Sequence, residues 1–450
     1  MIVPAPGPET LAVGEKNANI YEMVDFKNAA NLILMSTLSA VAPESLVYRH
    51  VKNSGETLLV GQSVVSVGER PLLCLGAGKA SARMAAALYH TIRHPFDDGT
   101  VVTPKGYVSG TPGCHARAAG HPVPDQRSLL AAEEALEIAR KWVDRDPLVL
   151  ATVSGGASAL WCAPVEGLTL EQKIEAGKWL LASGLSITQV NTIRRRLSAI
   201  KGGRLAAALE GAEAHVLVLS DVPMTAKLDV VGSGPFHHDP TTNDEALAAL
   251  DQSQITPPAW LVDAVKHSPP PPDPQTFTRV HHHLIGSNHD AVIAAAVRAA
   301  QLDLHPIVET EPLTGEAAVV GRNLYERASA MEINRPTCLV FGGETTVTIR
   351  DKAGKGGRNQ EMALAFALAA EGNKHISLLA FTTDGIDGAS LSAGAFVTGQ
   401  TAGEIRRLGL DSIDHLHRHD SHTALAAADC LINTGPTGTN VADVALVFIG

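Results

Sequence analysis

The sequence has few aromatic residues and few cysteines. Phe, Trp and Tyr make up 4% of the 450 residues, so the core must be built mainly from Ala, Leu, Val and Ile. The five cysteines lie far apart and form no Cys-x-x-Cys pair, which excludes a cysteine-rich zinc module and gives no disulfide framework. Those that lie inside apolar runs are expected to be buried, reduced thiols.

An excess of positive charge and long apolar runs are also lacking. The formal net charge is -11, which argues against a nucleic-acid partner, because nucleic-acid binding needs a basic face. A small anionic substrate is compatible with this charge, since a few Lys and Arg residues in a cleft suffice. No run approaches the ~20 apolar residues that a membrane span requires, and no secretory signal pattern opens the chain. The sequence therefore predicts a cytoplasmic enzyme without a membrane partner.

The length of the chain predicts two domains, since single cores usually split beyond ~250–300 residues. A helix is expected to start near Asp25 after an aperiodic arm. The clearest break is the segment HSPPPPDPQT at 267–276, because consecutive prolines continue neither a helix nor a central strand. We predict an N-terminal domain over 22–266, a proline-rich linker over 267–277 and a C-terminal domain over 278–450.

Both predicted domains repeat one pattern, a short apolar run that ends abruptly in Gly, Ser or Asp. These runs with their turns are Pro71–Ala80, Leu148–Ser158, His215–Val222, Thr337–Glu344 and Ile376–Gly388. Such runs are typical of buried parallel strands, and α/β sheets bind ligands at the carboxyl ends of their strands. The pattern predicts two α/β domains with an active site in the cleft between them.

The first turn is a candidate anion site. Gly76 and Gly78 let the backbone approach a phosphate, and Lys79 adds a positive charge where a helix begins. The turn is not a Walker A loop, because no Ser or Thr directly follows Lys79, and Ser81 occupies the third glycine position of a dinucleotide fingerprint. Anion binding is slightly favoured over a tight turn with a solvated Lys.

Two more segments of the first domain carry candidate binding residues. Ser154, Gly155 and Gly156 form a second turn of the same kind, and Ser154 lacks the Gly-x-Ser-x-Gly elbow of a hydrolase nucleophile. The stretch from Arg194 to Lys201 packs four cations into eight residues. A solvated helix face and neutralisation of a substrate or phosphate are equally weighted interpretations of this stretch.

The densest polar segment of the chain lies in the second domain. The candidate binding residues there are Gly343, Glu344, Lys355, Arg358, Asn359 and Gln360. An Arg on a flexible glycine turn can hold a carboxylate or a phosphate through two hydrogen bonds. A glycine turn without a function would seldom carry so many polar side chains, so a binding role is favoured.

Carboxylates in the second domain could hold a metal ion. Asp384 and Asp387 lie three residues apart in the turn TDGIDG. Mg²⁺ prefers one or two carboxylates together with substrate phosphates, and Asp221 or Glu344 could complete such a site. An ordinary Asp-Gly turn is the alternative. The tract His281–His283 is expected to be surface or loop histidine, because no Cys or carboxylate completes a zinc-binding spacing.

Taken together, these segments resemble the glycerate 2-kinase family, the class II glycerate kinases often labelled hydroxypyruvate reductases. The matching stretches keep a constant order from about residue 25 to 450. They include GAGKASARMA, GHPVPDQRS, SGGASALWCAPVEGLTL, LSAIKGGRLA, GGETTVTI, GKGGRNQEMAL, TDGIDG and NTGPTGTNVADV. So many ordered motifs are far more specific than a single Gly-x-Gly.

This resemblance implies a Rossmann-like N-terminal domain, a C-terminal domain with a MOFRL region at about 335–446, and an active site between them. It implies ATP, Mg²⁺ or another divalent cation, and phosphorylation of D-glycerate at its 2-hydroxyl. Lys79 and Arg358 fall on the residues that the family regards as essential. We assign them, in either order, to the transferring phosphoryl group and the substrate carboxylate. Asp221, Glu344 and Asp384 are candidates for metal binding or for orienting the 2-hydroxyl, and a homo-oligomer is compatible with the sequence.

Three other functions are alternatives to this kinase. A hydroxypyruvate reductase that uses NAD(P)H should carry a full dinucleotide fingerprint with its ribose-binding acid, which the sequence lacks. A kinase of a related small sugar acid stays open. A sugar-acid sensor without catalysis is disfavoured by Lys79, Arg358 and the acidic turns.

Overall fold

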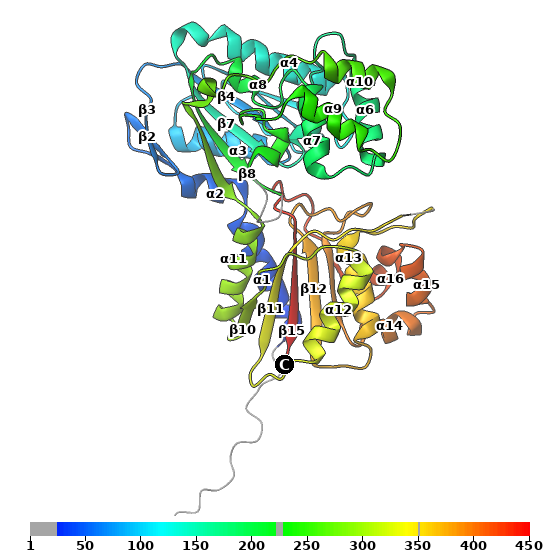
Figure 1. Ribbon diagram of the computed structural model, residues 1–450. Coiled ribbons are helices and arrows are strands. Elements are labelled where there is room, and N and C mark those ends of the chain that lie inside the picture. The colour runs from blue at the N-terminus through cyan, green and yellow to red at the C-terminus, as the bar shows by residue number, and fades with distance from the viewer. Residues whose placement is uncertain (1–24, 222–227, 350–351) are drawn as a thin grey trace, which may run out of the picture.

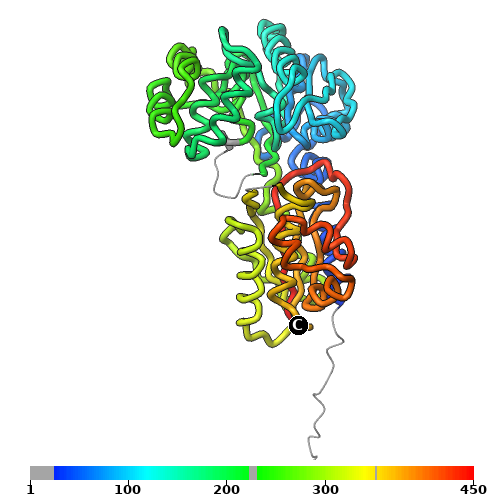
Figure 2. The backbone as a smooth tube through the Cα atoms, turned by 90° about the vertical axis from the view of Figure 1, so that its right-hand side faces the viewer, coloured from blue at the N-terminus to red at the C-terminus, as the bar shows by residue number. Residues whose placement is uncertain are grey.

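The computed structural model describes residues 25–221, 228–349 and 352–450, and it forms two lobes, one above the other in Figures 1 and 2. Each lobe is built around its own six-stranded sheet. We call them the N-terminal lobe and the C-terminal lobe. The start of the predicted N-terminal domain, residues 22–24, lies outside the described residues.

The sheet of the N-terminal lobe is entirely parallel. Its strands are β4 (Leu72–Ala77), β5 (Asp98–Pro104), β6 (His115–Ala119), β7 (Leu148–Ser154), β8 (Glu213–Leu219) and β9 (Val280–Gly286). They lie in the order β6-β5-β4-β7-β8-β9. Counted from β4 this is the order 3-2-1-4-5-6 of the Rossmann fold, which confirms the Rossmann-like prediction. The strand order reverses between β4 and β7, the place where such sheets bind ligands.

Alternating side chains explain why these strands are buried on both faces. In β4, Leu73 and Leu75 pack in the cluster that contains the Ala-rich helix α4 (Gln126–Lys141). The intervening Cys74 packs in the opposite cluster with α3 (Ser81–Ile92). Because alanine side chains are short, the helices can lie close to the sheet, and the core needs few aromatic residues.

The remaining elements of the N-terminal lobe are mainly helical. They are α2 (Pro43–His50), α5 (Ala157–Leu160), α6 (Leu170–Ala182), α7 (Ile187–Arg196), α8 (Arg204–Ala207), α9 (Asn243–Asp251), α10 (Ala259–Lys266), the 3₁₀ helices Val143–Arg145, Leu228–Ser233 and Pro274–Phe277, and a small antiparallel sheet of β1 (Val51–Asn53), β2 (Thr57–Val60) and β3 (Ser63–Ser66). Helices α6, α7, α9 and α10 share a separate apolar core beside the sheet.

The sheet of the C-terminal lobe is mixed. Its strands, in spatial order, are β10 (His305–Val308), β11 (Thr337–Gly343), β15 (Asp443–Ile449), β12 (Ile376–Thr382), β13 (Gly394–Thr398) and β14 (Leu431–Ile432). The helices are α1 (Phe26–Ala40), α11 (Asn288–Gln301), α12 (Ala317–Ser329), α13 (Arg358–Ala369), α14 (Thr401–Arg407), α15 (Ser412–His417) and α16 (Ser421–Ala427). Helices α1 and α11 cover one face of the sheet, and α12 and α13 cover the other (Figure 1).

The sheet topology differs from the predicted domain boundaries at two places. Strand β9 follows the proline-rich segment and is the edge strand of the first sheet, so the predicted linker at 267–277 lies one strand too early. This segment runs along the N-terminal lobe, where Arg204 donates to the carbonyl oxygens of Pro269 and Pro270 at 2.8 and 3.1 Å. Helix α1 belongs to the C-terminal lobe, with the rings of Phe26 and Phe448 5.5 Å apart.

No single helix in the described part of the chain is long and apolar enough to span a membrane. Helices α1 and α2 meet the criterion of length and composition only when they are taken together, and they are bent by 52° at the break between them.

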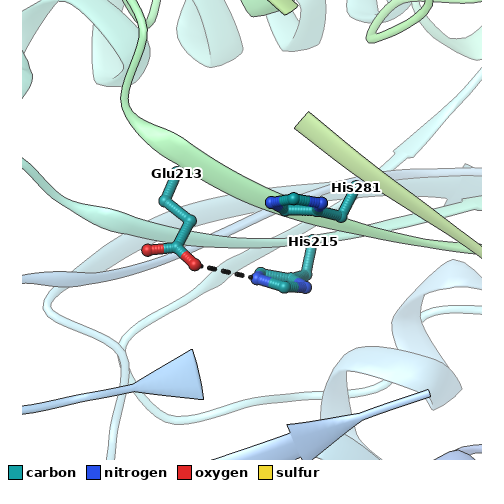
Figure 3. A group of neighbouring side chains, drawn as sticks. All are labelled: Glu213, His215 and His281. Carbon is teal, nitrogen blue, oxygen red and sulfur yellow. Dashed lines mark hydrogen bonds and ion pairs between the residues drawn. The ribbon is translucent and has the colours of Figure 1, made fainter. Parts of the chain in front are cut away.

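The histidine tract His281–His283 is expected from the sequence to be surface or loop histidine. It lies in the strand β9 and not in a loop, and His281 is exposed while His282 and His283 are half-buried. The ring of His215 on β8 stacks on His281 with centroids 4.8 Å apart, and its Nε2 lies 3.2 Å from Glu213 (Figure 3). The possible ligand atoms of Glu213, His215 and His281 lie within 4.8 Å of one another. Arg70 already pairs with Glu213 at 2.7 Å, so ion pairing and ring stacking account for this cluster.

Candidate active site

The carboxyl ends of the parallel strands bring the predicted turns of the N-terminal lobe together. The turn after β4 contains Lys79, whose backbone N–H donates to the carbonyl of Gly155 after β7 at 2.9 Å. Gly78 has a φ of 136°, and a Cβ at this position would lie 2.0 Å from the Ser154 hydroxyl oxygen. Only glycine permits this contact, so the two turns at the switch point form one unit.

The Lys79 side chain reaches across to the other lobe. Its Nζ lies 2.7 Å from Oδ2 of Asp384, in the turn after β12. The side chains of Lys79 and Asp384 are 19% and 10% exposed, so this ion pair is shielded yet open to a small ligand. The predicted cation of one domain and the predicted carboxylate of the other therefore meet directly.

Asp221, after β8, faces the same place. Its Oδ2 accepts a hydrogen bond from Nδ2 of Asn440 at 3.1 Å, and a Cβ on Gly155 would lie 2.1 Å from that oxygen. Burial raises the pKa of Asp221, and the negative charge of Asp384 adds to this effect, while the positive charge of Lys79 opposes it. Asp221 is thus a partly accessible carboxylate beside the ion pair between the lobes.

The mixed sheet explains how the C-terminal lobe gathers its polar side chains. Strand β15 runs antiparallel to β11 and β12, so its first residue pairs with their last residues. Asp443 is the partner of Gly343 in β11 and of Thr382 in β12. The amino end of β15 therefore lies at the same sheet edge as the turns that contain Glu344 and Asp384.

Arg358, the first residue of α13, pairs with two carboxylates at this edge. Its Nη2 donates to Asp443 at 2.9 Å and lies 3.1 Å from Glu344. Burial alone would lower the pKa of Arg358, but the hydrogen bonds and charges of these two carboxylates outweigh burial and raise it. Burial raises the pKa of Asp443, and the pairing with Arg358 opposes this shift. The Arg358 side chain is 28% exposed, and its guanidinium stays charged.

Asn359 and Gln360 are buried side chains that hold a turn. Their backbone N–H groups donate to the carboxylate of Asp387 at 3.2 and 2.9 Å, and their side-chain amides donate to the same carboxylate. Burial raises the pKa of Asp387 to about 6, and these N–H groups oppose the shift. Because both side chains are fully buried, they do not face a ligand as predicted. They join the start of α13 to the turn that carries Asp384.

Three other predicted residues are also held by neighbouring structure. The hydroxyl of Ser154 is buried and accepts from the N–H of Ala80 at 3.0 Å, so it supports the start of α3. A Cβ on Gly76 would lie 2.3 Å from Ser81 and from Thr152, so this glycine permits close packing. The exposed Lys355 lies in a loop whose backbone donates to Asp420 at 2.9 Å.

The predicted cationic stretch splits into two parts. Arg195 and Arg196 are buried and pair with Asp239, so they are structural. Arg194 and Lys201 lie apart from this ion pair and line a pocket of the N-terminal lobe. The burial of Arg195 and Arg196 contradicts a solvated helix face, and neutralisation of a substrate or phosphate by Arg194 and Lys201 stays a prediction.

Family models match both lobes of the chain. The model of a domain of unknown function, DUF4147, matches residues 29–266, and that of the MOFRL family matches residues 337–443. The D-glycerate 2-kinase of Thermotoga maritima is 34% identical over 436 residues, which cover 96% of this chain and 100% of that relative. The chain belongs to the glycerate 2-kinase family.

Other members of the glycerate 2-kinase family agree with this assignment. The glycerate 2-kinase of Pyrococcus horikoshii is 34% identical over 95% of this chain and 98% of its own. The crystal structure of Thermotoga maritima glycerate kinase has a TM-score of 0.81 and 33% identity, covering 94% of this chain and 99% of that one. A relative from Agrobacterium vitis, 38% identical over 84% of this chain and 98% of its own, is named only provisionally as a hydroxypyruvate reductase.

Four residues of the site were not selected from the sequence: Tyr107, His121, Asn440 and Asp443. Burial lowers the pKa of His121, and the positive charge of Lys79 adds to this effect. The ring of His121 lies close to the turn at Gly156, because a Cβ on Gly156 would be 2.9 Å from its Nε2. Burial and then the charge of Asp384 raise the pKa of Tyr107. His121, Asn440 and Asp443 lie in stretches that match the family, which was the available signal. Tyr107 carried no such signal.

Proposed function

We propose that this protein is an ATP-dependent kinase that transfers the γ-phosphoryl group to the 2-hydroxyl of D-glycerate. The observation that carries the proposal is the contact between Lys79 and Asp384, because it joins the Rossmann switch point to the polar edge of the C-terminal lobe. Phosphoryl transfer needs positioned cations and carboxylates more than covalent chemistry by the protein. The lobes supply both kinds of group at one place.

The two cations have different shapes, which suggests their roles. Lys79 is a point charge at the turn where Rossmann sheets bind nucleotides, so we assign it to the transferring phosphoryl group. Arg358 presents a planar fork that matches a carboxylate, and we assign it to the acid group of glycerate. Binding there would replace the more exposed of its two partners, Glu344, and keep the buried one, Asp443.

Asp221 suits the removal of the proton from the 2-hydroxyl. A carboxylate with a raised pKa is a stronger base than an exposed Asp, and the hydrogen bond from Asn440 fixes its orientation. The carboxylate oxygens of Asp384 and Glu344 are the ligand type that Mg²⁺ prefers, so this donor set fits a divalent cation. When bound there, the cation would neutralise phosphate oxygens. Cytoplasmic location and independence from nucleic acid and membranes stay predictions.

A reductase that uses a nicotinamide cofactor is the second candidate. It would need a glycine at position 81 and a ribose-binding acid after the second strand of the Rossmann order. Ser81 instead donates to the carbonyl of Thr152 at 2.7 Å, and β5 is followed by Lys105 and Gly106. Neither feature of the reductase class is present, so the kinase is favoured.

A pair of assays on the purified protein tests this proposal. With D-glycerate and Mg·ATP we expect ADP to form, and omission of glycerate or chelation of the metal should abolish it. Parallel reactions with L-glycerate and other small sugar acids measure the preference for the acid. Consumption of NADH with hydroxypyruvate, without any ADP release from glycerate and ATP, would contradict the kinase assignment.

A further inference from the structure

A cavity of about 220 Å³ lies in the N-terminal lobe between helix α6, helix α7 and the segment 122–124. Its walls are largely apolar and include Val123, Ile174 and Leu197. Four cationic side chains also line it, Lys173, Arg194, Lys201 and the exposed Lys178, and we call this cavity the cationic pocket. None of the proposed roles of Lys79, Arg358 or the carboxylates uses it.

None of these four cations has a carboxylate partner among the described residues. Lys201 Nζ donates to the carbonyl of Ser158 at 2.6 Å, and Lys173 Nζ donates to the carbonyls of Ala163 and Leu197 at 2.8 and 2.9 Å. Within the described parts of the chain, no hydrogen bond or ion pair holds Arg194, and no Asp or Glu of those parts lines the cavity. The nearby Arg195 and Arg196, by contrast, share Asp239.

Clustering these charges in an apolar setting is costly. Burial lowers the pKa of Lys201 to about 7, and the positive charge of Lys173 adds to this effect. Burial likewise lowers the pKa of Lys173 to about 8. Buried charges are normally paired, so an arrangement of neighbouring cations without an acid suits an anion supplied from outside the chain.

The cationic pocket adjoins the site of Lys79 along the backbone. Ser158, which holds Lys201, lies two residues after Gly156 in the turn at the switch point. His121 lies beside Gly156, and the next residue, Pro122, lines the pocket. A ligand with an apolar end and a row of anionic groups could therefore lie in the pocket and extend its last group to Lys79.

We propose that the cationic pocket binds the nucleoside end of ATP. The apolar walls take the base, Arg194 and Lys201 contact the phosphates nearest the ribose, and the chain of phosphates runs past Ser158 to Lys79. This inference rests on the proposed kinase function. It adds Lys173 and the α6–α7 helices to the groups that determine the choice of phosphoryl donor.

Filling the pocket tests this assignment without removing a charge. Gly177 lines the pocket within α6, and a Cβ there would meet no atom within 4 Å. Gly177→Leu should favour the helix, since Leu has a higher helix propensity than Gly, while its side chain occupies the cavity. The matched control is Gly403→Leu in α14, where a Cβ has only one side-chain atom within 4 Å, at 3.8 Å.

For both Gly177→Leu and Arg194→Gln we expect the KM for ATP to rise by about tenfold or more. The Kd for ADP, measured by calorimetry without glycerate, should rise by a similar factor. A change of this size corresponds to the loss of one charge-assisted hydrogen bond or its equivalent. The KM for glycerate should stay within about twofold of the wild-type value. Gly403→Leu should change neither.

Three results would overturn the pocket assignment while the kinase assignment stands. These are unchanged ADP binding in Gly177→Leu, a rise in the KM for glycerate instead of ATP, and an equal effect in Gly403→Leu. Wild-type protein that binds ADP in this pocket but forms none from ATP and glycerate would instead refute the proposed function alone.

Discussion

Replacing Lys79 by Met is expected to lower kcat by about 10²–10³-fold, the loss typical of removing one group that stabilises developing charge. The side chain contacts Asp384, and the backbone N–H that bonds to Gly155 is retained in the variant. Asp384 keeps a second support, because its Oδ1 accepts from the N–H of Ile386 at 3.1 Å. The thermal midpoint of unfolding should therefore change little.

Lys141→Met is a matched control for this experiment. Lys141 pairs with Asp98 at 2.6 Å as Lys79 does with Asp384, but its side chain is 64% exposed on the surface of the N-terminal lobe. Initial rates at saturating ATP and glycerate, measured beside the circular dichroism melt, compare the two variants. A folded Lys79→Met protein with nearly normal kcat would contradict the catalytic role and would mean that Lys79 is only a solvated residue of the turn.

Replacing Arg358 by Gln is expected to reduce both activity and stability. The side chain of Asp443 is only 6% exposed, so the loss of Arg358 leaves a buried carboxylate without its cation. Breaking a buried ion pair in this way typically costs about 3–5 kcal/mol of unfolding free energy. The kcat should also fall by about 10²-fold or more if the guanidinium positions the acid substrate.

The double variant Arg358→Gln with Asp443→Asn separates these two effects. Removing both charges should restore most of the lost stability, because no unpaired charge then remains buried. The activity should not return, since the substrate carboxylate still lacks its cation. Chemical unfolding and initial rates on the single and double variants measure this. Recovery of kcat together with stability would mean that Arg358 acts only through the fold.

The sequence was most informative where a local pattern decides the structure. Apolar runs that end in Gly, Ser or Asp correctly predicted strands with polar carboxyl ends, and parallel strands must present those ends at one edge. Lys79 and Asp384 could therefore be selected from the turns alone, although their contact joins residues 305 positions apart.

Other features depend on pairings that no local pattern contains. Asp443 lies at the site only because β15 is antiparallel to β11 and β12, a register set by the whole sheet. Asn359 and Gln360 resembled ligand-binding residues because the first turn of a helix needs polar partners in either case. The proline-rich segment resembled a linker, since its consecutive prolines are stiff both between lobes and along the surface of one.

The proton-coupled ³¹P NMR spectrum of the product tests the central claim most directly. Purified protein would convert D-glycerate and Mg·ATP, and the new phosphate signal would be recorded. Transfer to the 2-hydroxyl places phosphorus next to a carbon with one hydrogen, so the account predicts a doublet that appears only when glycerate, ATP and the divalent cation are all present. A triplet, which reports phosphorus next to the CH₂ of the 3-position, would contradict the assigned hydroxyl, and the absence of any new ester signal in folded protein would contradict the kinase itself.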